Sequence, residues 1–199
     1  KPLQRDLRKK IGKEIYCEND ANCFALSEAI DGSGKHYKIV FGVILGSGVG
    51  GGLVIDKRIV NGPNGITGEW GHNQIPSVCI NGTQIKKTNL RVGEIENYVA
   101  GLGLSKAFKH KFKKDLPANR IFERYRKHDL DAEKLIDEYK DKLAMSLATV
   151  VNIIDPDVFV FGGGVSNEID FLDEIKQKMK KFVAGGEFEG TFLKPKFGD

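Results

Sequence analysis

The pattern of hydrophobic and polar positions alternates between short apolar runs and longer helical periodicities, which indicates an α/β protein. An apolar run at 39–45, and the stretch 157–161, which is apolar after Asp157, have the length of buried strands. Between them, residues 131–154 carry apolar side chains close to helical spacing. Asp155-Pro156 ends that helix, because proline disfavours helical backbone at the residue before it. A final helix is expected after 162–164, and its inner side consists of Ile169, Leu172, Ile175, Met179 and Phe182.

The N-terminal part of the chain predicts a short strand followed by a helix. Residues 14–18 (EIYCE) have the composition of a strand. Asn19 or Asp20 begins the helix, since both residue types cap helix N-termini well and helix formers follow them. The glycine-rich stretch 31–34 ends this helix. Asp20 is therefore expected at a strand-to-helix junction, where side chains can reach a ligand.

The middle of the chain predicts an antiparallel meander. The strand at 39–45 is followed by a glycine turn at 46–52, a second strand, a tight turn at Asp56-Lys57 and a third strand. Residues 62–74 are polar and rich in glycine, so we expect a loop there. From Glu94 onward the pattern is helical until the second buried strand.

Composition and charge indicate a soluble protein of a reducing compartment. The 199 residues include 24 glycines, 6 prolines and three cysteines without a Cys-x-x-Cys pair, which argues against a disulfide framework. No apolar run approaches the roughly 18 residues of a membrane helix, and the N-terminus has no signal-peptide pattern. The densest basic cluster, Lys106–Lys114, favours a solvated helix face over a nucleic-acid patch. We expect a cytoplasmic protein with neither a membrane nor a nucleic-acid partner.

Two glycine turns follow apolar strands, at 46–52 and at 162–164. Glycines permit a close backbone approach and free N–H groups to point at phosphate oxygens, and Ser47 adds a hydroxyl donor. Either turn alone is better explained as a strongly twisted hairpin turn. The first is not a Walker loop, since no Gly-Lys-Ser/Thr follows it. Two such turns in one α/β chain favour a nucleotide site.

Several polar residues have the chemistry of a sugar kinase. Asp20 is a candidate base that takes a proton from a sugar hydroxyl, and the alternative is a helix cap without chemistry. Glu69 and His72 combine an acceptor with a group that both donates and accepts, as hexose hydroxyls require. Taken singly, His72 is better explained as an ordinary loop histidine than as a ligand, and Glu96 is similarly ambiguous.

Four motifs occur in order along the chain: ENDANCFALSEA at 18–29, LGSGVGGG at 45–52, GEWGH at 68–72 and DPDVFVFGGGVSN at 155–167. Together they resemble the ROK family of repressors, uncharacterised reading frames and sugar kinases. The resemblance covers essentially the whole chain and implies an actin-like/hexokinase (ribonuclease H-like) fold. It also implies ATP with Mg²⁺ as the phosphate donor and a homodimer formed through the C-terminal lobe.

The resemblance implies a role for each residue at a matching position. Asp20 would be the catalytic base, and Asn19 beside it would bind the sugar. The residues holding sugar hydroxyls would be Glu69, His72 and Glu96. The residues cradling phosphates would be Gly46, Ser47 and Gly48, and those lining the adenosine pocket would be Gly162, Gly163 and Gly164.

Within the family, the fructokinase and manno(fructo)kinase branch is the most similar, on the stretches 64–76, 150–167 and 185–189. We therefore expect phosphorylation of fructose at its 6-hydroxyl. The N-acetylglucosamine kinases share ENDANCFALSEA and IENY almost as well, so they and glucokinases remain alternatives. A sugar-sensing repressor would need an upstream helix-turn-helix module, and an intact GSGVGGG with Asp20 favours a kinase over it.

The chain departs from the family pattern at both ends. The opening strand with its Asp-x-Gly-Gly-Thr phosphate motif is absent, and the sequence stops at Gly198-Asp199, before the family's last helix. We expect residues 1–16 to be the tail of an N-terminal lobe and its crossover, and 17–199 to be most of the C-terminal lobe. These residues alone are expected to be inactive.

A third departure concerns zinc. The family usually carries a Cys-x-Cys-Gly knuckle and a further cysteine before the IENY-like segment, but 91–96 contains no cysteine and Cys79 lies early. A structural zinc site needs about four N/S ligands, and His72 with Cys79 supplies two. Either the zinc site is lost, with His72 as its remaining candidate ligand, or the knuckle is missing from this sequence.

Overall fold

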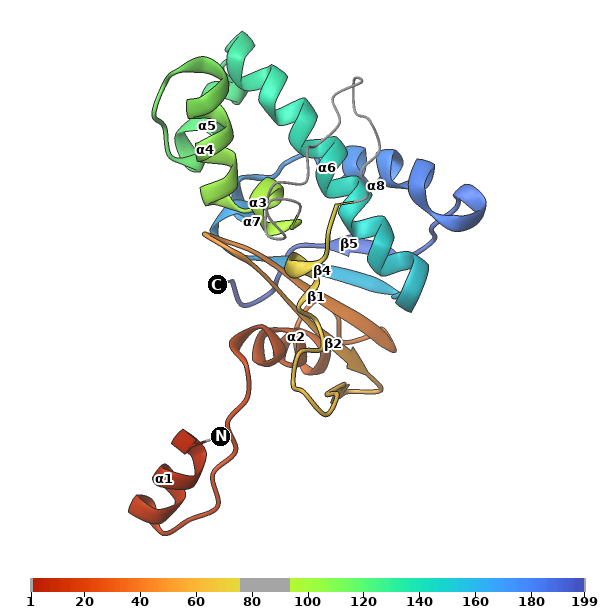
Figure 1. The fold of residues 1–199 in the computed structure, drawn as a ribbon. Helices are drawn as coiled ribbons and strands as arrows, with labels where there is room; N and C mark the ends of the chain where they lie inside the picture. Colours follow the sequence, from red (N-terminus) through yellow and green to blue (C-terminus); the bar gives the residue numbers. More distant parts are fainter. Residues whose placement is uncertain (1, 76–93, 199) are drawn as a thin grey trace.

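The computed structural model describes residues 2–75 and 94–198, which form a five-stranded sheet with helices on both faces (Figure 1). The strand order is β3-β2-β1-β4-β5. The strands are β1 (Ile39–Leu45), β2 (Val49–Ile55), β3 (Arg58–Ile59), β4 (Val158–Gly162) and β5 (Thr191–Leu193). β1, β2 and β3 form the predicted antiparallel meander, whereas β4 runs parallel to both β1 and β5. Because β1 and β4 are parallel, the glycine turns that follow them meet at one edge of the sheet.

Helix α2 (Asp20–Ile30) covers one face of the sheet, and most other helices lie over the opposite face (Figure 1). The helices of that second layer are α3 (Glu96–Val99), α4 (Gly101–Phe112), α5 (Ala118–Arg126), α6 (Leu130–Ile154), α7 (Gly164–Glu168) and α8 (Leu172–Met179). The period of two along β4 explains this division: Val158 and Val160 pack with Ala25 of α2, while Phe159 and Phe161 belong to the larger core beneath α6. Asp20, the first residue of α2, therefore lies on the face of the sheet opposite to α6.

The predicted strand at 14–18 is wrong, because this stretch is irregular backbone after helix α1 (Pro2–Ile11). The carbonyl oxygen of Ile15 accepts hydrogen bonds from the side chains of Gln4 at 2.7 Å and Arg8 at 3.2 Å. Side chains of α1 thus satisfy a backbone acceptor that a neighbouring strand would otherwise pair. Figure 1 shows α1 standing apart from the sheet, joined to α2 by this segment.

The glycine turn after β1 is shorter than predicted. Only 46–48 form the turn, closed by a hydrogen bond from Gly46 N to Gly48 O at 3.0 Å, and Gly50, Gly51 and Gly52 belong to β2. The final helix also differs from the prediction, because it breaks into α7 and α8 at 169–171. Two short 3₁₀ turns and the unpredicted strand β5 follow α8.

Glu28 holds the far end of α2 in place. Its side chain is buried at 1% exposure and accepts backbone N–H groups from Ser33 at 2.8 Å, Lys196 at 3.1 Å and Phe197 at 3.2 Å. Buried carboxylates are stable when such bonds replace their water shell. The C-terminal segment is therefore bonded to the far end of α2.

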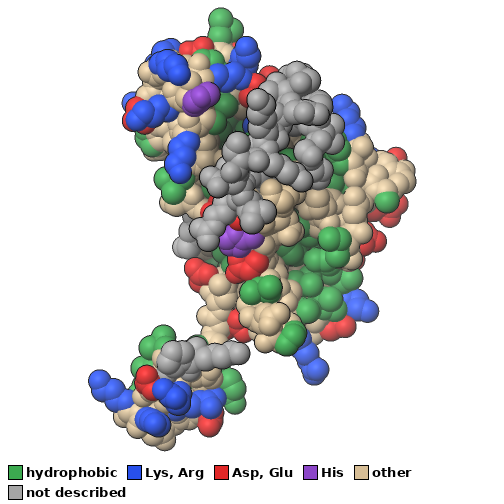
Figure 2. Space-filling model, in the orientation of Figure 1, with side chains coloured by type: hydrophobic (Ala, Val, Ile, Leu, Met, Phe, Trp, Pro, Cys, Tyr) green, Lys and Arg blue, Asp and Glu red, His purple; other side chains and the backbone are tan. Residues whose placement is uncertain are grey.

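The basic cluster on α4 lies at one end of the molecule, where Figure 2 shows several basic side chains. Lys109 pairs with Asp115, Lys111 with Glu138, and Lys114 with Asp131. These ion pairs offset much of the local positive charge. Within 2–75 and 94–198, no helix has the length and apolar character that crossing a membrane requires.

Candidate active site

At the N-terminus of α2, one residue caps the helix and the next carries an exposed carboxylate. Asn19 is the N-cap, with extended backbone at φ −64° and ψ 144°, and its Oδ1 accepts Ala21 N at 2.8 Å and Asn22 N at 3.4 Å. Asp20 is the first residue of the helix and is exposed, although its Oδ1 also accepts Ala21 N at 2.9 Å. Because Asn19 caps the helix, helix formation does not depend on the Asp20 carboxylate.

Three sequence-predicted parts of the site converge on Val49 and Gly50 at the start of β2. From α2, Ala21 packs so closely that a Cβ at Gly50 would lie 3.4 Å from the Ala21 Cβ. From the GEWGH loop, Trp70 Nε1 donates to Gly50 O at 2.8 Å. From α3, Glu96 Oε2 accepts Val49 N at 2.9 Å. Ala21, next to Asp20, and Trp70, next to Glu69, therefore both contact Gly50. Glu96 itself contacts Val49, the residue before it.

The glycines of β2 make these close approaches geometrically feasible. A Cβ at Gly52 would meet Ala21 O at 2.7 Å, on the α2 side of the strand. A Cβ at Gly51 would meet Gly68 O at 2.8 Å, on the side of the GEWGH loop. Both distances are too short for any side chain, so glycine is required on both faces. Gly51 and Gly52 thus have a packing role that the sequence interpretation, which stressed phosphate contact, did not identify.

The two glycine turns line one cavity of about 520 Å³. Gly46 and Ser47 contribute from the first turn, and Gly164, Val165 and Glu168 contribute from the second turn and α7. The remaining wall comes from the starts of α4 and α5, including Leu102, Ser105 and Asn119. Gly101 N also donates to Gly46 O at 2.8 Å, which joins α4 to the first turn. The structure therefore brings together turns that lie more than a hundred residues apart in the sequence.

Three of the predicted nucleotide glycines lie beside this cavity and do not line it. A Cβ at Gly48 would meet Glu96 Oε2 at 2.7 Å, and one at Gly162 would meet the Phe24 ring at 2.7 Å. Gly163 has φ +92°, and a Cβ there would lie 2.4 Å from Leu45 O at the end of β1. Close packing accounts for all three glycines, and contact of any of them with a nucleotide stays a prediction.

Glu69 and His72 lie in a second cavity of about 620 Å³, between their loop and the C-terminal half of α6. His72 Nε2 is 3.6 Å from Glu69 Oε2, and His72 Nδ1 is 3.9 Å from Glu94 Oε2. Phe41 and Trp70 form the apolar part of the lining. Asp20 does not line this cavity, because α2 and the GEWGH loop pack on opposite faces of β2.

The sequence interpretation missed a polar network around the start of α2. Glu18 Oε1 accepts Asn19 N and Asn22 Nδ2, each at 2.9 Å, and Glu18 Oε2 accepts Asn61 Nδ2 at 2.7 Å. The hydrogen bond from Asn22 is the main cause that lowers the pKa of Glu18, followed by the Asn19 N–H, and burial only partly opposes this. Glu18 and Asn22 lie inside the ENDANCFALSEA motif, whereas nothing in the sequence connects Asn61 to them.

This network predicts a pH dependence of stability. The folded state holds the pKa of Glu18 below its ordinary value of 4.5, so the carboxylate stabilises the fold above that pH. The contribution is lost as pH falls through the lower, folded-state pKa. We expect the free energy of unfolding of the wild type to fall more steeply below about pH 4.5 than that of Glu18→Gln. Urea unfolding at pH values from about 3 to about 7 measures the free energy of unfolding of both proteins. This range begins about 1.5 units below the ordinary pKa.

Glu14→Gln serves as the matched control, because Glu14 forms an exposed ion pair with Arg8 and does not bond to α2. It should keep the wild-type pH profile. Parallel profiles for wild type and Glu18→Gln would contradict the role given to the Glu18 network.

Zinc binding by His72 stays a prediction. In the part of the chain that is described, no three or more His, Cys, Asp or Glu side chains form a group that could hold a metal ion. Cys79, the other candidate ligand, lies outside the described residues.

Residues 1–199 match the ROK family over their full length. The chain belongs to the ROK family. It is 41% identical over 182 residues to an N-acetyl-D-glucosamine kinase of Pectobacterium carotovorum, covering 89% of this chain and 59% of that protein. This ROK chain thus spans about three fifths of the length of that relative. The match does not support the fructokinase branch that the motifs suggested.

Solved structures confirm the predicted actin-like/hexokinase fold of this ROK chain. A ROK hexokinase from Thermus thermophilus superposes with a TM-score of 0.83 and 26% identity, covering 99% of this chain and 65% of that one. A ROK glucokinase from Streptomyces griseus, solved with glucose and AMPPNP, gives 0.80 and 26%, covering 100% and 68%.

Proposed function

We propose that this chain is part of an ATP-dependent kinase that phosphorylates N-acetylglucosamine at its 6-hydroxyl. The observation that carries the kinase activity is the single cavity lined by both glycine turns, Gly46-Ser47 and Gly164. Glycine-lined turns with free N–H groups suit phosphate oxygens. The relative that is 41% identical is an N-acetyl-D-glucosamine kinase, which supports N-acetylglucosamine as the substrate in place of fructose.

In the proposed reaction, the sugar 6-oxygen attacks the γ-phosphorus of ATP as the bond to the β–γ bridging oxygen breaks and ADP leaves. Asp20 accepts the hydroxyl proton. Its exposure at the start of α2 and its freedom from the main capping role support this assignment. Phosphoryl transfer depends mainly on positioning and on neutralising charge, so one carboxylate base is sufficient.

The other roles are proposed as follows. Gly46, Ser47 and Gly48 contact the phosphates, and Gly162, Gly163 and Gly164 border the adenosine. Mg²⁺ accompanies ATP. Asn19 and Glu96 are proposed to hold sugar hydroxyls. The same role is proposed for Glu69 and His72, which line a cavity that Asp20 does not line. We also propose that the protein acts as a homodimer.

A substrate panel tests the proposal. The complete polypeptide is assayed with ATP and N-acetylglucosamine, glucose, mannose or fructose, and kcat/KM is compared. We expect N-acetylglucosamine to exceed the others by about tenfold or more, because a site that binds the acetamido group loses those contacts with plain hexoses. A higher kcat/KM for fructose would restore the fructokinase interpretation. No phosphorylation of any sugar, together with tight DNA binding, would favour a sugar-sensing repressor.

A further inference from the structure

The cavity between the two glycine turns contains an unexpected charge. Among its described lining residues, Glu168 is the one ionisable side chain, and the others are neutral. A nucleotide that enters there carries several negative charges on its phosphates. Like charges repel, and the repulsion is stronger near a protein surface than in bulk water. An uncompensated Glu168 carboxylate would therefore oppose nucleotide binding.

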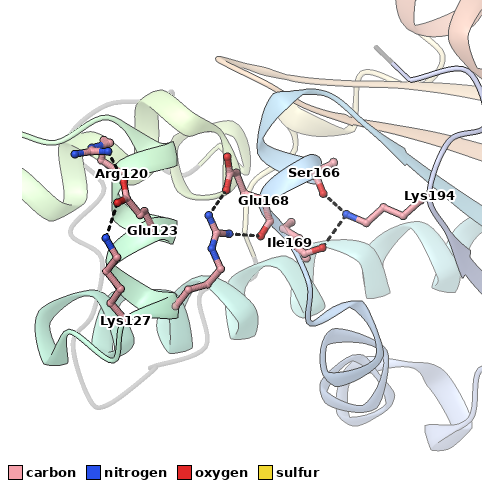
Figure 3. Close-up of polar contacts among 8 residues, drawn as sticks. Arg120, Glu123, Lys127, Ser166, Glu168, Ile169 and Lys194 are labelled. Carbon is pink, nitrogen blue, oxygen red and sulfur yellow. Dashed lines mark hydrogen bonds and ion pairs between the residues drawn. The ribbon is translucent and has the colours of Figure 1, made fainter.

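Arg126 compensates this carboxylate. It is the last residue of α5, and its Nη2 lies 2.8 Å from Glu168 Oε2 while its Nη1 donates to Glu168 O at 3.4 Å (Figure 3). The Glu168 side chain is 26% exposed and that of Arg126 is 44% exposed, so the pair is shielded only partly from water. The guanidinium, which is not among the residues lining the cavity, thus offsets the charge of Glu168.

Neither helix depends on this ion pair for its position. Lys194 Nζ holds α7 from the other side by donating to Ser166 O and, at 2.7 Å, to Ile169 O (Figure 3). α5 is held by Tyr125, whose hydroxyl accepts Lys140 Nζ at 2.9 Å and whose ring packs on Phe171 at 5.8 Å. Removing Arg126 should consequently change the charge of the cavity more than its shape.

We propose that Arg126 neutralises the Glu168 carboxylate so that the cavity accepts the phosphates of a nucleotide. Arg126 is then a positioning residue that acts through Glu168 and not through direct contact with the reacting atoms. The inference rests on the proposed function, because it assumes that this cavity binds ATP.

The neighbouring residue provides a matched control. Lys127 is also a cation at the end of α5, but it pairs with Glu123 at 2.7 Å on the same helix. Glu123 also pairs with Arg120 (Figure 3). None of these three residues lines the cavity. Lys127→Ala therefore removes the same charge from the same helix end without exposing a carboxylate in the cavity.

The test compares a charged probe with a neutral one. Isothermal titration measures the Kd of ADP and of adenosine for the complete polypeptide and its variants. We expect Arg126→Ala to weaken ADP binding about five- to twentyfold, from one unmasked charge in a partly screened site, and to change adenosine binding less than about twofold. Arg126→Ala combined with Glu168→Gln should regain wild-type ADP affinity, and Arg126→Lys should retain most of it. Lys127→Ala should match the wild type for both probes.

Each contrary result overturns the inference in a different way. Equal losses for ADP and adenosine would mean that Arg126 maintains the shape of the cavity. A double variant as weak as Arg126→Ala, or an equal loss in Lys127→Ala, would exclude masking of Glu168. Wild-type ADP affinity in Arg126→Ala would overturn the inference and leave the proposed function intact. Absence of ADP and adenosine binding to the wild type would overturn both.

Discussion

Asp20→Asn is expected to lower the kcat of the complete polypeptide by about 10²–10⁴, the usual cost of losing a general base. Asparagine has nearly the same shape as aspartate but cannot accept the proton from the sugar hydroxyl. Asn19 keeps the N-cap hydrogen bonds of α2, so the helix should remain folded in the variant. The KM values for sugar and ATP should stay within a few-fold of wild type, because the change affects the transition state and not binding.

Steady-state assays with N-acetylglucosamine and ATP measure this effect. Asp31→Asn is the control, since Asp31 is the C-cap at the other end of the same helix. It should leave kcat unchanged. If Asp20→Asn kept activity within a few-fold of wild type, Asp20 would not be the base.

The largest expected loss of stability comes from Phe159→Ala. Phe159 is fully buried in β4, and the centroid of its ring lies 5.7 Å from that of Phe41, 5.8 Å from that of Phe188 and 5.3 Å from that of Phe192. Truncation removes the buried ring and leaves a cavity among these rigid neighbours. We expect the free energy of unfolding to fall by about 3–5 kcal/mol. The midpoint of urea unfolding, with the slope held in common, measures the loss.

Phe197→Ala is the matched control, because Phe197 is 56% exposed and lies outside the aromatic cluster. It should change the free energy of unfolding by about 0.5 kcal/mol or less. Phe159→Leu should fall between the two. Equal midpoints for Phe159→Ala and Phe197→Ala would contradict this account of the core.

Local signals predicted much of the fold correctly. The apolar runs at β1 and β4 are strands, Asn19 is a helix cap, and α6 ends before Asp155-Pro156. These features depend on residues close together in the chain, so periodicity and capping preferences suffice. The same signals failed at 14–18, which is irregular backbone between α1 and α2. They also failed at β5. This strand has only three residues and is recognised by its pairing with β4, which the sequence does not reveal.

The family match was visible in the motifs, but the packing reasons for several motif residues were not. Gly51 and Gly52 were expected within the glycine turn at 46–52, whereas the structure shows them in β2, in contact with the GEWGH loop and α2. A glycine required for close approach and one required for a ligand are indistinguishable in a sequence. Only the neighbours across β2 separate the two cases.

The amino-acid order was sufficient to establish the α/β class, the start of the helix at Asp20, and membership of the ROK family. Three-dimensional packing was needed to show that both glycine turns line one cavity, that Glu18 bonds to Asn61, and that Arg126 pairs with Glu168. These last two pairs are 43 and 42 residues apart in the chain. Partners so distant meet because of the path of the sheet and its helices, which no short stretch of residues encodes.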